Sequence, residues 1–175
     1  MFILGNGIAL FCPSGSYCEL GSDGPLECPL NTYRHLVGGK NITDCFACPA
    51  GYWCNITGLA GILGYECPVG YYCLQGQSPV ACPGGTLRSR VGAKNSSECL
   101  ACPSRYYCPD GIANIDGIPC SASYYCPIGS ALQKLCPGGH YCPAMTGKPL
   151  ICPGRHRMYS CLLYMKKKWS TYAFE

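Results

Sequence analysis

Cysteine is the residue type whose number and spacing could do chemistry in this chain, because 18 of its 175 residues are cysteine. Thiols in such numbers either oxidise to disulfides or bind metal ions as thiolates. Cys45 and Cys48, and again Cys99 and Cys102, have zinc-knuckle spacing, and Cys108 could add a third ligand. The even count is what a fully paired set requires, so we expect disulfides and keep a reduced zinc-binding protein as an alternative.

Three Asn-x-Ser/Thr sequons agree with an oxidising, secretory environment. They predict N-linked glycosylation at Asn41, Asn55 and Asn95. Asn41 and Asn95 fall at the same place in two repeats, which makes this pair more informative than a single sequon. We therefore expect an extracellular protein, either secreted or the ectodomain of a membrane protein.

Other catalytic chemistry has little support in the sequence. His35 and His156 have no nucleophile nearby in sequence, His140 occupies a motif position that is tyrosine in other copies and is expected to pack, and the carboxylates are isolated. A Cys-x-x-Cys redox site would need a thioredoxin-like βαβ context, which is absent. We expect no enzyme activity and no cofactor.

Composition indicates how such a chain folds. Gly (23) and Pro (15) are abundant, whereas large apolar residues are sparse, with 4 Phe and 2 Trp. A chain with too little apolar surface needs cross-links, each worth roughly 3 kcal/mol for a loop of about 15 residues. We predict a small disulfide-rich fold: an elongated array of short β-hairpins and irregular loops, with little or no helix and no single hydrophobic core.

Charge and hydropathy exclude two classes of partner. Residues 1–154 carry eight basic and eight acidic residues, and the net excess of +4 lies in residues 155–175, so nucleic acid is not an expected partner. No segment has the roughly 20 apolar residues of a membrane span, so membrane contact is expected only through a segment outside this chain. The apolar segment 1–11 lacks a basic n-region and a cleavage site. We interpret it as a poor signal peptide and expect a fragment or an N-terminally truncated chain.

Internal repeats organise the chain. Cysteines recur at an offset of 54 or 55 residues, with a sixteen-residue gap before each Cys-x-x-Cys pair. The predicted segments are an apolar N-terminal segment at 1–11, repeats at 12–66 and 67–119, a degenerate third repeat at 120–161, and a disordered basic tail at 162–175.

A smaller motif, Cys-Pro-x-Gly-x-aromatic-Cys, recurs inside each repeat, as in Cys67-Pro-Val-Gly-Tyr-Tyr-Cys73. A sister motif ends in arginine, at Arg34 and Arg88. Pro presets the second position of a type I turn and Gly is favoured at the fourth. Asn31 suits the Gly position, whereas Arg105 and Ser123 suit it less, so we expect a different turn at those two.

Two disulfide frameworks fit the spacing. Both pair Cys28 with Cys45 and Cys82 with Cys99, which bracket the sixteen-residue gaps. In the local framework each short motif closes on itself, as in Cys12–Cys18 and Cys67–Cys73. In the crossed framework, which we favour because it ties neighbouring motifs together, the remaining pairs are Cys48–Cys67, Cys54–Cys73, Cys102–Cys120, Cys108–Cys126, Cys136–Cys152 and Cys142–Cys161. This leaves Cys12 and Cys18 for upstream partners.

These motifs, with Gly38 and Gly92 before the Cys-x-x-Cys pairs, resemble the ephrin-receptor-like cysteine-rich repeats over about residues 12–154. Such repeats are similar in style to growth-factor-receptor and tumour-necrosis-factor-receptor modules. The resemblance implies a segment of an extracellular modular protein, and it is specific as a repeat type but unspecific as to function.

The favoured function is an extracellular module that serves as a structural spacer or as a surface for an unknown protein partner or the extracellular matrix. Four tyrosines, each two residues before a cysteine, form the predicted partner surface: Tyr52, Tyr71, Tyr106 and Tyr124. The alternatives are a small secreted protease inhibitor or toxin-like protein, which a protease-inhibition assay would detect, and the reduced zinc-binding protein, which thiol alkylation would detect.

Overall fold

A computed structural model describes residues 2–3, 9–114 and 116–152. The predicted tail and Cys161 lie outside these residues, so the expectations for them are not addressed by the structure. Among the described residues, no helix has the length and apolar character needed to cross a membrane.

The chain divides into two compact units. Unit 1 comprises Met1–Cys82 and Arg88–Leu100, and unit 2 comprises Pro83–Leu87 and Ala101–Glu175. The division falls inside the segment 67–119. The repeat boundaries drawn from the sequence stay a prediction.

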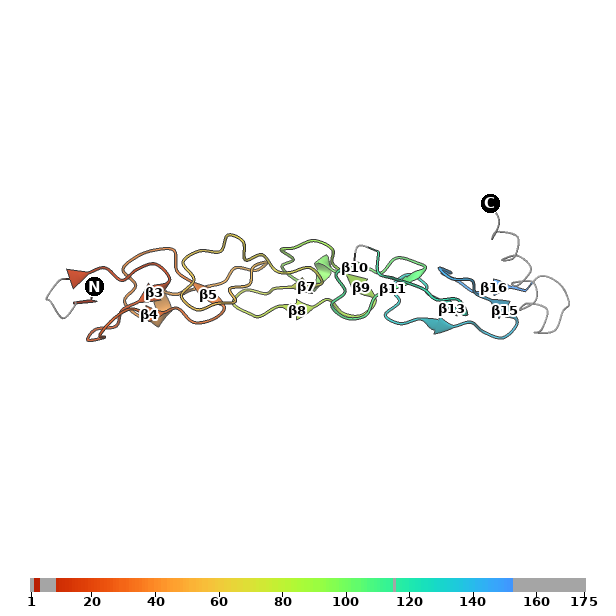
Figure 1. Cartoon of the computed structure of the whole chain (residues 1–175), viewed down its shortest axis with the longest axis horizontal. Coiled ribbons are helices and arrows are strands. Elements are labelled where there is room, and N and C mark those ends of the chain that lie inside the picture. The colour runs from red at the N-terminus through yellow and green to blue at the C-terminus, as the bar shows by residue number, and fades with distance from the viewer. Residues whose placement is uncertain (1, 4–8, 115, 153–175) are drawn as a thin grey trace, which may run out of the picture. The chain divides into compact units, whose positions relative to one another are not determined.

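Short antiparallel strand pairs make up the regular structure (Figure 1). The pairs are β1 (Phe2–Ile3) with β2 (Ala9–Leu10), β3 (Ser16–Tyr17) with β4 (Leu26–Glu27), β5 (Thr32–Tyr33) with β6 (Phe46–Ala47), β7 (Tyr71–Tyr72) with β8 (Val80–Ala81), β9 (Thr86–Leu87) with β10 (Leu100–Ala101), β11 (Tyr106–Tyr107) with β12 (Ile118–Pro119), β13 (Tyr124–Tyr125) with β14 (Lys134–Leu135), and β15 (His140–Tyr141) with β16 (Leu150–Ile151). The helical elements of the described residues are two single 3₁₀ turns, η1 (Ile42–Asp44) and η2 (Ser96–Glu98). The predicted disulfide-rich hairpin array with little helix is confirmed.

Each Cys-Pro-x-Gly motif forms one tight turn, shifted by one residue from the predicted register. The fifth residue of the motif donates its N–H to the carbonyl of the second, as Tyr71 does to Pro68 at 3.3 Å. The fourth residue therefore sits at the third turn position, where a positive φ selects glycine, and Gly70 has φ 80°. The different turn expected at Arg105 and Ser123 is wrong, because both adopt the same left-handed conformation, with φ 79° and 71°.

The disulfides follow the local framework, which corrects the favoured crossed pairing. The turn brings the Cα atoms of the first and seventh residues to 5.7–6.0 Å, an ordinary disulfide spacing. Each short motif thus closes on itself, in the pairs Cys12–Cys18, Cys48–Cys54, Cys67–Cys73, Cys102–Cys108, Cys120–Cys126 and Cys136–Cys142. Cys12 and Cys18 therefore need no upstream partners.

The loop disulfides Cys28–Cys45 and Cys82–Cys99, common to both frameworks, are confirmed. Cys152 is disulfide-bonded as well. Its predicted pairing with Cys136 is wrong, and so is that of Cys142 with Cys161, because Cys136 and Cys142 bond to each other.

Backbone hydrogen bonds, not crossed disulfides, join neighbouring motifs inside each unit. The left-handed fourth residue donates its N–H to the carbonyl of the last residue of the next motif, and its own carbonyl accepts from the first cysteine of that motif. In unit 1, Gly51 donates to Cys73 at 2.9 Å and accepts from Cys67 at 2.8 Å. In unit 2, Arg105 donates to Cys126 at 2.8 Å and accepts from Cys120 at 2.9 Å. These backbone hydrogen bonds join neighbouring motifs, a role that the crossed framework had attributed to disulfides.

In most motifs, two consecutive residues from a later loop, here called a clamp, hydrogen-bond to the first and the last residue of the motif. The first clamp residue is left-handed and donates to the first cysteine carbonyl, while the second is buried and accepts from the N–H of the last motif residue, with N···O distances of 2.7–3.0 Å. The clamps are Gly38-Gly39, Gly58-Leu59, Gly92-Ala93, Gly129-Ser130 and Met145-Thr146. In four of these five motifs the closing residue is bound by backbone on both sides; Cys18 is bound by its clamp alone.

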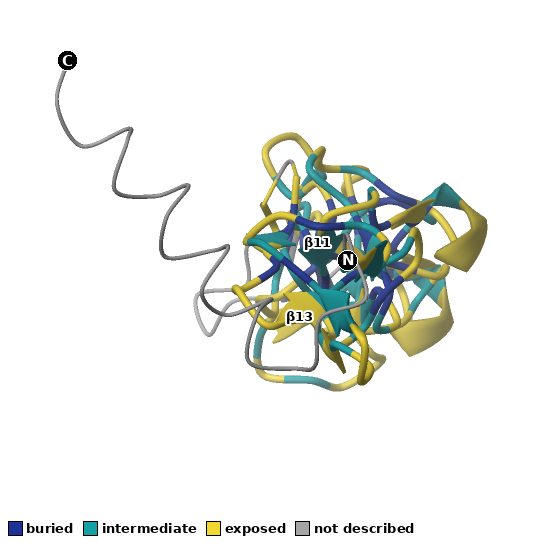
Figure 2. Cartoon of the chain, turned by 90° about the vertical axis from the view of Figure 1, so that its right-hand side faces the viewer, coloured by how far each residue is buried: buried dark blue, intermediate teal, exposed yellow. Residues whose placement is uncertain are grey.

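Cystine sulfur takes the place of a hydrocarbon core. The largest fully buried side chains among the described residues are all cysteines, and Figure 2 shows buried segments inside a surround of exposed turns. Small clusters form on them, with Leu59 in unit 1 and Leu87 in unit 2 as the buried leucines. The expected absence of a single hydrophobic core is confirmed for the described part of the chain.

Candidate interaction surface

The four predicted surface tyrosines fall into two kinds. Tyr52, in an isolated bridge with Glu66, packs partly on the cluster of Cys48, Cys54 and Leu59 in unit 1. Tyr106, on β11, packs partly on the cluster of Leu87, Cys102 and Cys108 in unit 2. These two tyrosines extend the small cores of their units and are only half-exposed.

Tyr71 and Tyr124 are the more accessible members of the set. Each is 36% exposed and begins a strand, β7 in unit 1 and β13 in unit 2. Across the strand pairs, Tyr124 lies opposite Leu135, which is 70% exposed, whereas Tyr71 lies opposite the half-buried Ala81. Tyr71 and Tyr124 are therefore the positions from which the predicted partner surface can be tested.

A further aromatic group on unit 1 was missed from the sequence. The rings of Tyr33, His35 and Phe46 form a triangle, with centroid separations of 5.6 to 5.9 Å. Tyr33 and Phe46 are paired across β5 and β6, so the hairpin fixes these two rings. In the sequence, this group could have been recognised from the aromatic residues Tyr33 and Phe46 in the Cys28 loop. The corresponding residues of the second loop are Leu87 and Leu100.

Two of the three predicted glycosylation sites have a common, well-defined geometry. Asn41 and Asn95 are the N-caps of η1 and η2, and each side-chain oxygen accepts from the backbone N–H two residues on, at 3.0 Å. The hydroxyl of the third sequon residue, Thr43 or Ser97, donates to the same oxygen. Because both asparagines are exposed, the side chain that would carry a glycan is accessible.

Asn55 differs from these two sites. It is exposed and follows Cys54 directly, but its sequon hydroxyl, Thr57, donates to the Glu27 carboxylate of the neighbouring hairpin and not to the asparagine. Glycosylation at all three asparagines stays a prediction, and the structure describes two kinds of local environment for it.

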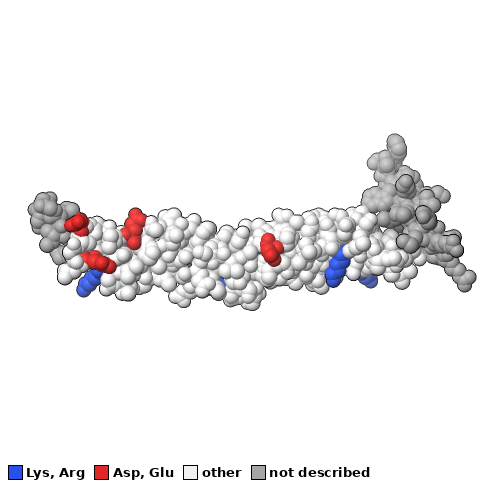
Figure 3. All heavy atoms as spheres, turned by 90° about the horizontal axis from the view of Figure 1, so that it is seen from below, with Lys and Arg blue, Asp and Glu red and all other residues white. Residues whose placement is uncertain are grey.

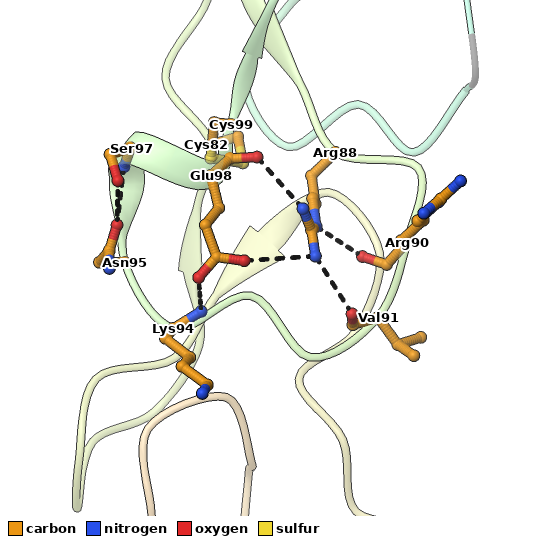
Figure 4. A network of polar contacts seen from close by, with 9 residues as sticks. All are labelled: Cys82, Arg88, Arg90, Val91, Lys94, Asn95, Ser97, Glu98 and Cys99. Atoms are coloured by element: carbon orange, nitrogen blue, oxygen red, sulfur yellow. Dashed lines mark hydrogen bonds and ion pairs between the residues drawn. A yellow bond between two sulfur atoms is a disulfide. The ribbon is translucent and has the colours of Figure 1, made fainter.

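The arginines of the sister motifs are structural residues whose role the sequence analysis overlooked. Arg88 takes the place of the closing cysteine and binds the loop that follows it (Figure 4). Its Nε donates to the carbonyl of Arg90 at 3.0 Å, and its guanidinium also contacts the carbonyl of Val91 and the carboxylate of Glu98. The recurrence of arginine at one motif position, in both repeats, was the available signal.

The carboxyl group of Asp44 is more acidic than that of an ordinary aspartate. Its carboxylate accepts from the backbone N–H groups of Lys40 and Asn41, at 2.6 and 3.3 Å. These two hydrogen bonds, with a smaller contribution from the charge of Arg34, hold the pKa of Asp44 below its ordinary value. The carboxylate thus completes the capping box of η1 as an ion.

The cysteines of the proposed zinc knuckle are occupied. Cys99 bonds to Cys82, and Cys102 bonds to Cys108, so these sulfurs are not available as thiolates. Within the described ranges, no group of three or more His, Cys, Asp or Glu side chains is arranged to hold a metal ion. The disulfides overturn the reduced zinc-binding alternative.

Charge is dispersed over the described surface. Figure 3 shows few charged side chains on the face drawn; most lie apart, and one acidic and one basic side chain are adjacent near the left end of the view. An ion pair joins Arg88 to Glu98 at 3.4 Å.

The chain was compared with known protein families and with curated proteins. No family model matches the chain, and no curated protein is significantly similar to it.

Proposed function

We propose that this chain is an extracellular cysteine-rich repeat module that serves as a spacer or protein-interaction surface of a larger secreted or cell-surface protein, and that it is not an enzyme. The observation that carries the proposal is the interior, where the fully buried side chains are cysteines in disulfides. Such an interior is stable where disulfides persist, as they do in secreted proteins and in the ectodomains of membrane proteins. The ephrin-receptor-like resemblance of the motifs supports the same assignment.

The array has the properties of a scaffold. Each Cys-Pro-x-Gly-x-aromatic-Cys motif is closed by its own disulfide, and neighbouring motifs are joined by pairs of hydrogen bonds between backbone groups. Surface residues are thus free to vary while the framework stays fixed. A module of this kind suits a spacer, and it also suits a surface on which exposed tyrosines contact a partner.

Expression through the secretory pathway of a eukaryotic cell tests the compartment. We expect secreted protein without alkylatable thiols and with glycans that peptide N-glycosidase removes. Asn41→Gln and Asn95→Gln should each remove one glycan, and the matched variant Asn31→Gln, outside any sequon, should remove none. Secreted protein with reactive thiols in residues 12–152, or without any glycan, would contradict the assignment.

Paired tyrosine variants test the interaction surface. We expect Tyr71→Ser with Tyr124→Ser to weaken binding to a decellularised extracellular-matrix preparation while leaving the disulfides intact. The matched control removes two apolar side chains elsewhere on the surface, by Leu63→Ser and Leu132→Ser, which are 92% and 71% exposed. Equal binding of the tyrosine and control variants would leave the tyrosines without a role in recognition.

A further inference from the structure

Unit 2 contains a cavity of about 420 Å³ beside the turn that the Cys120–Cys126 disulfide closes. Its volume lies in the range of small-molecule sites, which is roughly 300–1,000 Å³. Its apolar lining comes from four residues that follow this turn in the sequence: Pro127, Ile128, Met145 and Leu150. Arg105 and Lys148 complete the lining with two cationic side chains.

Two of the lining residues depart from the pattern of the array. Arg105 stands at the fourth motif position, with φ 79°, where glycine occurs at Gly15, Gly51, Gly70, Gly85 and Gly139. Met145 is the first residue of its clamp, with φ 57°, where each of the other clamps has glycine. Left-handed backbone is unfavourable for long side chains, and residues held in it collect at functional sites.

The same turn holds both strained residues in place. Arg105 donates to the carbonyl of Cys126 and accepts from the N–H of Cys120, while Met145 donates to the carbonyl of Cys120 at 2.8 Å. Thr146 follows Met145, is 7% exposed, and accepts from Cys126 at 2.9 Å. Because the backbone on both sides is fixed by these bonds, the two side chains are presented to one cavity from a rigid base.

The lining has a defined chemical character. Arg105 and Lys148 make no ion pair and no side-chain hydrogen bond with any residue that the structure describes. No aspartate or glutamate lines the cavity, and the apolar side chains stay accessible, with Ile128 71% and Met145 42% exposed. The cavity therefore combines an apolar surface with unpaired positive charge.

We propose that this cavity binds a small apolar molecule that ends in one carboxylate. The hydrocarbon part would cover Ile128, Met145 and Leu150, and the carboxylate would meet the guanidinium of Arg105, whose planar donors match a carboxylate in a bidentate fashion. Lys148 would add a second positive charge. The carboxylate has two natural sources, a free organic acid or the terminal residue of a peptide, and both have this chemistry.

Binding is measured on the full, disulfide-bonded chain with defined probes. The first pair is octanoate and octan-1-ol, and the second is an acetylated peptide ending in leucine and the same peptide with a C-terminal amide. We expect chemical-shift changes at the amides of Ile128 and Met145 with octanoate or the free-acid peptide, and about ten-fold or more weaker binding of the neutral partner of each pair. Which acid binds more tightly identifies the source.

Variants restore the pattern of the array and so avoid unfolding. Arg105→Gly returns the common motif residue and relieves the left-handed strain, so it should raise stability while weakening octanoate binding about ten-fold. Arg105→Gln removes only the charge and should weaken binding similarly. Arg90→Gln makes the same charge change at an exposed residue of unit 1 and should leave binding unchanged.

Three results would overturn the site: no binding of either acid, equal binding of octan-1-ol, or unchanged affinity in both Arg105 variants. The proposal goes beyond the spacer or interaction role and is independent of it. Failure of the site would leave the secretion and glycosylation results untouched, and reactive thiols in the secreted protein would contradict the module without reference to the cavity.

Discussion

The loops that follow Cys28 and Cys82 share one plan but bind their arginines differently. In the first loop, Arg34 is 7% exposed and donates to the carbonyls of Asp44 and Val37, at 2.6 and 3.3 Å. In the second, the Arg88 side chain is 19% exposed, and its guanidinium has longer contacts of 3.0–3.4 Å, one of them to the Glu98 carboxylate.

The acidic residues of the two loops differ by one methylene group. The Asp44 carboxylate binds the backbone of Lys40 and Asn41, whereas the longer Glu98 side chain binds the backbone of Lys94 at 2.9 Å and reaches Arg88 as well. Arg34 is therefore neutralised mainly by carbonyl dipoles, and its Nε is buried without a hydrogen-bond partner. The comparison teaches that a buried cation, held by backbone oxygens, can replace a closing disulfide in this motif.

Removal of the loop disulfides should have the largest effect and should not distinguish the loops. Each closes a separation of 17 residues, so Cys28→Ala with Cys45→Ala, and Cys82→Ala with Cys99→Ala, should each cost about 3 kcal/mol of unfolding free energy. Urea titration followed by NMR amide signals of each loop measures the loss. A difference above about 1 kcal/mol would show that the loops differ in more than their arginines.

Replacement of the arginines should separate the two loops. Arg34→Ala should cost about 2 kcal/mol, because a short charged hydrogen bond is lost in a buried site, whereas Arg88→Ala should cost about 1 kcal/mol, since water can reach its more exposed contacts. The same urea titration applies, with Arg90→Ala as the exposed control. Equal losses for Arg34→Ala and Arg88→Ala would contradict the contrast drawn between the loops.

Acid should weaken the first loop through Asp44, and this effect should be the smallest of the three. Because hydrogen bonds lower the folded pKa of Asp44, its stabilisation is complete above the ordinary aspartate pKa and is lost as the pH falls through the lowered value. Asp44→Asn should therefore reduce the loss of loop stability at acid pH. Amide hydrogen exchange between neutral and acid pH measures this pH dependence. Asp23→Asn, an exposed change elsewhere in unit 1, should leave it unchanged.

Much of the fold could be predicted from the spacing of cysteines. The sixteen-residue gaps identified Cys28–Cys45 and Cys82–Cys99, and the Pro and Gly positions indicated tight turns. The choice of the crossed framework failed because spacing carries no information about the backbone ladder, which already joins neighbouring motifs. Ser123 illustrates the same limit, since its N–H donates to Cys142 and the resulting tertiary contact outweighs its residue preference.

The candidate sites were less predictable, for a related reason. Tyr52 and Tyr71 occupy the same motif position, yet Tyr52 packs on the cluster that contains Leu59, whereas Tyr71 is 36% exposed, and the motif position alone does not carry this difference. The sequence pattern that marks the cavity at Arg105 can be recognised only once the structure is known. Met145 is recognised as a departure from glycine once the hydrogen bond to Cys120 aligns the clamps.

Mass mapping of the non-reduced protein tests the central claim most directly, namely that each motif closes on itself and backbone hydrogen bonds join the motifs. Cleavage between motifs should release peptides that each retain an internal bond, such as Cys67–Cys73 and Cys120–Cys126. Peptides joined across motifs, such as Cys48 to Cys67 or Cys102 to Cys120, would contradict it.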